Sequence, residues 1–240
     1  MNALLVARRD LESYLQGYFA YIILAALLFM NGVGFYALGI DDSSFSHEVL
    51  ERFFYLCWGF TVATAVLLTM RSLGQEYEQG TDVLLRGSTV TDAEVVVGKW
   101  LAALGMVFIY LVLTFHMPLL IMVNGKVSVG HLFVGYLGVL LGGGAAAAMG
   151  VFFSALVRNQ IAAGILAGVT AIFMSVFSFR VADRFDPPLS DIMDYIAIFG
   201  RHFVQFQEGT LSLSATVFNL SLAAMFLALA SYVLNTRRWE

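Results

Sequence analysis

Hydrophobic residues fall into six long runs along the chain, separated by short polar segments. Each run approaches the roughly 20 residues that an α-helix needs to cross the hydrocarbon core of a bilayer. The second run is the shortest. The sequence leaves open whether its helix continues into the loop that follows. The pattern predicts six membrane-spanning helices, at residues 18–38, 53–70, 101–123, 131–153, 161–179 and 213–235.

A different pattern precedes the first run. Apolar residues recur at helical spacing, and charged or polar residues fill the opposite face. This predicts an amphipathic helix over residues 1–17 that lies in the membrane interface; a frayed tail is the alternative. The apolar positions are Leu4, Ala7, Leu11, Tyr14, Leu15 and Tyr18.

Composition supports an integral membrane protein. The 240 residues are 60% hydrophobic and 12% charged, whereas soluble domains carry about 25% charged residues. Six spans and short loops use the whole length, so we expect residues 1–240 to form one all-α transmembrane domain. The lone Cys57 excludes an intrachain disulfide.

Lysine and arginine residues near the span ends set the expected orientation. With the N-terminus inside, eight lie on the inner side and five on the outer side, which places both termini in the cytoplasm. The inner set is Arg8, Arg9, Arg71, Arg86, Lys99, Arg158, Arg237 and Arg238, and the outer set is Arg52, Lys126, Arg180, Arg184 and Arg201.

Small residues recur every four positions in two of the expected spans. In lipid, such rows let helix backbones approach closely. Two interpretations stay open, tight packing within the chain and a surface that slides on gating. The rows are Gly138, Gly142, Ala146 and Gly150, and then Gly164 and Gly168.

A few polar residues lie inside the expected spans. His116 stands near mid-span, two residues before Pro118. We expect a core histidine bonded to a backbone carbonyl freed by the proline, with a translocation-path role for His116 and Asn219 as the alternative. Asn31 and Asn219 are expected to form interhelical hydrogen bonds. No cluster of histidine, cysteine or methionine has ligand spacing, so no metal site is expected.

The inner segment 71–100 is too long for a simple turn. Its pattern predicts a helix, a break at Gly80-Thr81, a short helix beginning near Thr91, and re-entry into the membrane at Gly98-Lys99. A short helix across the inner face suits a groove on a soluble partner. An ordinary solvated loop is the alternative.

The same segment resembles the loop between the second and third spans of type-2 ABC exporter permeases. It is most similar to the small permeases of gliding motility and copper-enzyme maturation. The resemblance implies that the matching residues dock an ATPase subunit; Thr89 and the pair Tyr77-Glu78 depart from the family pattern. The matching residues are Glu76, Gly80, Thr81, Leu84, Leu85, Ser88, Val90, Glu94, Gly98 and Lys99.

The outer segment 180–212 supports the same family. Apolar residues at three- and four-residue steps after Pro187-Pro188 predict an amphipathic, membrane-dipping helical hairpin, with Gly200 as a candidate break. His202 is expected at the outer interface. The apolar face comprises Leu189, Ile192, Ile196, Phe199, Phe203 and Phe206. The resembled permeases share a pattern that stands here as His202, Phe203, Phe206 and Gly209.

The resemblance implies a permease subunit of an ABC exporter in a bacterial cytoplasmic membrane. Two six-span subunits, identical or different, would form the translocation path, with two ATPase subunits bound to them. An outer-facing accessory protein is a further candidate partner. The sequence has no phosphate-binding P-loop motif, so we expect ATP and Mg on the ATPase, no cofactor on this chain and no nucleic-acid partner. Mechanical work on an outer partner, an ion-coupled secondary transporter and an intramembrane enzyme are the alternatives; no reactive constellation supports the last.

Overall fold

The computed structural model describes residues 2–39, 46–80, 90–125, 127–177, 185 and 189–237. The described elements are helices, which confirms the all-α class, and five of them are long and apolar enough to cross a membrane. The α-helices are α1 (Asn2–Gln16), α2 (Tyr18–Gly34), α3 (Ser46–Thr69), α4 (Gly74–Gln79), α6 (Asp92–Thr114), α7 (His116–Asn124), α8 (Val129–Leu156), α9 (Gln160–Ile172), α11 (Leu189–Ile196), α12 (Val204–Gln207) and α13 (Leu213–Arg237). The π-helical segments are η1 (Phe35–Gly39), η2 (Phe173–Phe177) and η3 (Ile198–Phe203).

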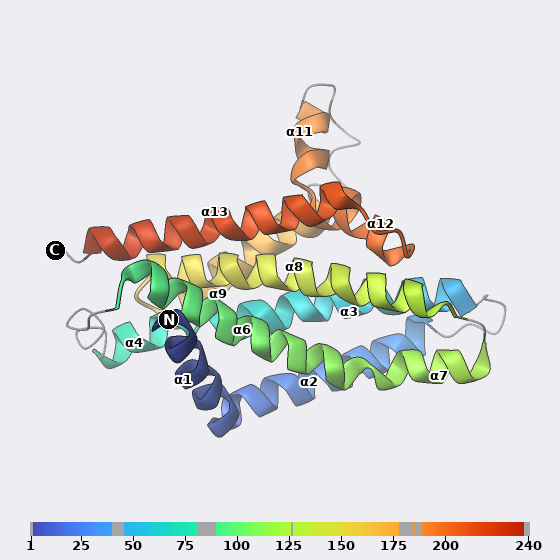
Figure 1. Ribbon diagram of the computed structural model, residues 1–240, viewed down its shortest axis with the longest axis horizontal. Helices are drawn as coiled ribbons and strands as arrows, with labels where there is room; N and C mark the ends of the chain where they lie inside the picture. Colours follow the sequence, from blue (N-terminus) through green and yellow to red (C-terminus); the bar gives the residue numbers. More distant parts are fainter. Residues whose placement is uncertain are drawn as a thin grey trace.

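The long helices run side by side along the longest axis of the molecule (Figure 1). One end of this bundle, here called the α4 end, holds α1, α4 and the last turns of α13. The opposite end, the α12 end, holds α7 and α12, while α11 projects sideways from the bundle. The N-terminal helix and the end of the last long helix therefore lie at the same end.

Helix α8 lies at the centre of the bundle, and its small residues let the neighbouring helices approach. A Cβ on Gly142 would lie 2.7 Å from Nε1 of Trp58, and one on Gly138 would collide with Phe206. Nε1 of Trp100 donates a 2.8 Å hydrogen bond to the Gly144 carbonyl. In this structure the small-residue row of α8 therefore serves tight packing.

Three expected span boundaries differ from the structure. Helix α3 begins at Ser46 instead of residue 53. The hydrophobic pattern missed this start because the first turns of the helix carry charged residues. Helix α6 begins at Asp92, so the separate short helix expected before Gly98-Lys99 was wrong. The expected span 161–179 is α9 followed by η2, and its apolar helix is shorter than the other five.

The predicted N-terminal helix is confirmed as α1, and it packs along α6. Leu11 lies against Gly105, where an added Cβ would be 3.3 Å from Cδ1 of the leucine. The Tyr14 hydroxyl donates a 3.1 Å hydrogen bond to the Leu68 carbonyl. Burial raises the pKa of Tyr14, which keeps this donor protonated. Its position in the membrane interface stays a prediction.

Candidate functional site

The α4 end of the bundle contains a buried charged cluster, here called the Lys99 junction, formed by Asp10, Ser72, Glu76 and Lys99. The Lys99 ammonium donates to Oδ2 of Asp10 at 2.9 Å, to Oε1 of Glu76 at 2.8 Å and to the Ser72 carbonyl at 2.7 Å. An ammonium has three donors, so all of them are used. The junction joins α1, the turn before α4, α4 itself and α6.

The charges of the junction are shielded to different degrees. The Lys99 side chain is only 2% exposed, whereas Asp10 and Glu76 are 15% and 19% exposed. Arg9 adds a second cation on the exposed side, with its Nη2 2.9 Å from Asp10 Oδ1 and 3.5 Å from Glu76 Oε1. A buried charge is costly without its partners, so α1, α6 and α4 with the turn before it are expected to stay together.

Further hydrogen bonds hold the start of α4, and α4 itself, to other helices. Oγ of Ser154, on α8, accepts hydrogen bonds from the amides of Leu73 at 3.0 Å and Gly74 at 2.9 Å. The amide of Gln160, at the start of α9, donates to Oε1 of Glu78 at 3.0 Å. Together with the Lys99 junction, these bonds connect the α4 region to α1, α6, α8 and α9.

Helix α4 ends at Gln79, and Gly80, at the predicted break, caps it. Gly80 has φ 67°, a left-handed conformation that favours glycine, and its amide bonds to the carbonyls of Glu76 and Tyr77. The predicted helix start near Thr91 is confirmed by reciprocal hydrogen bonds between Thr91 and Glu94, a capping box. Glu94 Oε2 also accepts from Nδ2 of Asn2 at 3.3 Å, which ties the start of α6 to α1.

The structure gives several of the expected docking residues a role inside the chain. Glu76 and Lys99 form the junction, Glu94 caps α6, and Gly98 faces α1. Val90 is partly buried just before α6. Docking itself stays a prediction, and Thr81, Leu84, Leu85 and Ser88 lie outside the described residues.

Helices α1 and α6 approach each other closely at Gly98. A Cβ there would lie 2.7 Å from Cβ of Val6 and 2.8 Å from the Ala3 carbonyl oxygen. Such distances require the backbone of α1 to move away. The sequence marks Gly98 as a family position, but only the packed structure shows what the missing side chain permits.

Replacement of Gly98 by alanine is therefore expected to destabilise the chain by about 1–3 kcal/mol, the usual cost of overpacking. Thermal melting in detergent measures the loss. Gly168→Ala on α9 is the matched control, because nothing lies within 4 Å of its added Cβ. A Gly98→Ala variant that melts at or above the temperature of Gly168→Ala would contradict the assigned contact.

The outer segment is anchored to the α12 end of the bundle. Phe203 and Phe206 are buried, and Phe203 packs on Trp58 with ring centroids 5.6 Å apart. Gly209 has φ 78°, and an added Cβ there would lie 2.7 Å from Cγ of His131. The predicted apolar helix is not continuous, because α11 ends at Ile196 and the chain continues as η3 and α12. The helix is therefore interrupted after Ile196 and not at Gly200, which lies within η3.

His202 is buried within the chain, and its expected position at the outer interface stays a prediction. The residue is 2% exposed, and its ring stacks on Phe218 of α13 with centroids 3.7 Å apart. Its Nε2 lies 3.1 Å from the Tyr195 carbonyl. The imidazole therefore connects α11, η3 and α13, where an aromatic face and a carbonyl satisfy it.

The two expected path residues are placed differently from each other. His116 is exposed instead of buried in the core, and its Nδ1 lies 2.8 Å from the Leu113 carbonyl. The carbonyl that Pro118 leaves without a helical hydrogen bond is that of Thr114. His116 therefore bonds to the Leu113 carbonyl instead of the expected one, at the break between α6 and α7. Asn219 is buried on α13. No hydrogen bond between described residues joins His116 to Asn219.

The asparagine predictions had different outcomes. Nδ2 of Asn31 donates a 3.0 Å hydrogen bond to the Tyr110 hydroxyl, which confirms an interhelical bond. Nδ2 of Asn219 donates to the Ala215 carbonyl of its own helix at 2.9 Å, so the expected interhelical bond was wrong. No group of three or more metal-ligating side chains occurs within the described ranges.

Comparison with known proteins identifies the family. No curated protein matches the sequence. The family model of the ABC-2 type transporter membrane domain matches residues 3–183, which include the Lys99 junction and the central helix α8. This match covers most of the chain and agrees with the helical membrane fold. The chain therefore belongs to the ABC-2 type transporter family and is a multi-pass membrane permease.

Proposed function

We propose that this permease subunit couples ATP hydrolysis by a separate ATPase subunit to export, or to mechanical work, across a bacterial cytoplasmic membrane. The supporting observation is the bonding of the α4 region to four helices, through Lys99, Ser154 and Glu78. A force on segment 71–100 would act on α1, α6, α8 and α9 together. Family membership favours this function over an ion-coupled secondary transporter.

The proposed assembly contains two permease subunits and two ATPase subunits. ATP and Mg would bind to the ATPase, because the permease sequence lacks a P-loop motif. The family resemblance is consistent with two uses of this energy: export of a solute, or mechanical work on an outer accessory protein. Because of the sequence similarity described above, we further propose that the chain belongs to the subtype of small permeases of gliding motility and copper-enzyme maturation.

The partner prediction is tested by affinity purification of the full chain from its own membrane in mild detergent. An ATPase with a P-loop should co-purify, and hydrolysis should follow that protein on further fractionation. The chain freed of it should hydrolyse no ATP. Recovery of folded permease without any P-loop protein, even after chemical crosslinking, would contradict the proposed assembly.

Both termini and segment 71–100 are proposed to face the cytoplasm. Exposed positions at the two ends of the bundle allow a test, since Glu12 and Thr236 lie at the α4 end and His47 and Thr210 at the α12 end. Cysteines at the first pair should resist impermeant thiol reagents in intact cells, whereas the second pair should react. Native Cys57 is fully buried and gives no background. The reverse labelling pattern would overturn the orientation.

A further inference from the structure

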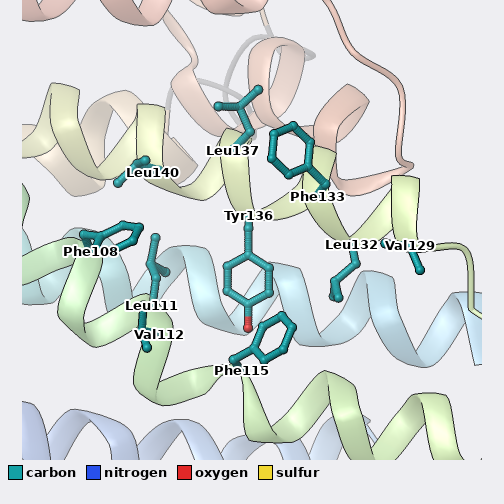
Figure 2. A pocket seen from close by; sticks show the side chains of 10 residues that line it. All are labelled: Phe108, Leu111, Val112, Phe115, Val129, Leu132, Phe133, Tyr136, Leu137 and Leu140. Carbon is teal, nitrogen blue, oxygen red and sulfur yellow. The ribbon is translucent and has the colours of Figure 1, made fainter.

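An apolar groove lies between α6 and α8 toward the α12 end of the bundle. Its volume is about 560 Å³, within the range of small-molecule sites. Figure 2 shows Phe108 and Leu140 near one end, Val129 and Leu132 near the other, and the Tyr136 ring between them. Phe108, Val129 and Phe133 are more than half exposed, so the groove opens sideways from the bundle.

The break at Phe115 creates this groove. Helix α6 packs against α8, but the chain bends after Thr114, and α7 packs against α3. The space that α6 vacates beside α8 is lined by Phe115 and Val112. The groove is therefore a product of the backbone path.

The described lining residues offer hydrocarbon and no free polar group. Tyr136 is the one lining side chain with a polar atom, and its hydroxyl lies 3.2 Å from Oγ1 of Thr114. The hydroxyl is thus satisfied inside the bundle, while the ring forms part of the groove wall. Such a surface would recognise an apolar ligand by burial alone.

The dimensions identify the shape of that ligand. The stretch of α8 from Val129 to Leu140 rises about 16 Å, close to half of a hydrocarbon core of about 30 Å. A membrane-crossing helix of a second copy would run along the whole core of about 30 Å, whereas a groove of about 16 Å matches one leaflet and therefore one acyl chain.

We propose that this groove binds one acyl chain of a bilayer phospholipid, from the leaflet at the α12 end. The groove spans the depth of one leaflet, opens laterally to lipid and presents only hydrocarbon. The bound chain fills the space beside the break at Phe115 and supports the bend between α6 and α7. This site is independent of ATPase docking.

The test measures lipid retained by the purified chain. Native mass spectrometry in mild detergent supplemented with phosphatidylethanolamine should find one phospholipid per chain. The double variant Val112→Trp/Leu140→Trp fills the groove and should lower the retained fraction at least tenfold. The matched control, Val217→Trp/Leu220→Trp on exposed positions of α13, should retain lipid like the original chain.

A second readout assigns the occupant. A phospholipid with a photoreactive acyl chain, in liposomes, should label groove residues of the original chain and not those of the double variant. Equal lipid retention by the filled variant, or crosslinks from the groove to a second copy, would overturn the proposal. Melting curves establish that each variant is folded. If the double variant does not fold, Val112→Trp alone replaces it, because Val112 lies on the exposed rim of the groove.

Discussion

Replacement of Lys99 by methionine is expected to destabilise the chain by about 2–3 kcal/mol. Removing one partner of a buried ion pair leaves an uncompensated charge and costs about 3–5 kcal/mol. We take a smaller value because Asp10 and Glu76 keep some contact with water, at 15% and 19% exposure. Thermal melting in detergent measures the change.

Two controls separate the buried charge from a general effect of mutation. Arg8→Ala removes an exposed pair with Glu12 and should lower the melting temperature far less than Lys99→Met, because water screens an exposed ion pair. The triple variant Lys99→Met/Asp10→Asn/Glu76→Gln removes all three charges of the junction and should recover much of the lost stability. A Lys99→Met variant as stable as Arg8→Ala would show that the junction does not hold these elements together.

Removal of two leucines is expected to give the largest effect on assembly. Each buried leucine contributes roughly 1.5–3 kcal/mol, so Leu84→Ala/Leu85→Ala should weaken ATPase binding about a hundredfold or more. Co-purification with the ATPase measures the affinity, and melting of the permease alone establishes that it is folded. A folded variant that binds the ATPase with its original affinity would assign docking elsewhere, with α1 and the turn around Arg158 as the next candidates.

The sequence predicted the elements better than their contacts. Residues 1–17 were expected as a helix from periodicity alone, and α1 spans Asn2–Gln16. The capping pattern at Thr91 likewise located the start of α6. These signals are local, because helical period and capping depend on residues within a few positions of one another.

Errors arose where tertiary packing decides the environment of a residue. Lys99 is 89 residues from Asp10 and 23 from Glu76 in sequence, and no local pattern reveals that they meet. His202 is likewise packed against Phe218 and the Tyr195 carbonyl, contacts that no local pattern in the sequence reveals. His116 lies in an apolar run, but the break at Phe115 leaves it exposed.

We expect the Lys99 junction to transmit movement from segment 71–100 to the bundle. The direct test is the distance between spin labels at Arg8 on α1 and Tyr232 on α13, both exposed, in the complex with the ATPase. ATP binding should change this distance in the chain with an intact junction. In the triple variant, with its ATPase still bound, the distance should stay the same. An equal ATP-dependent change in the triple variant would contradict transmission through Lys99.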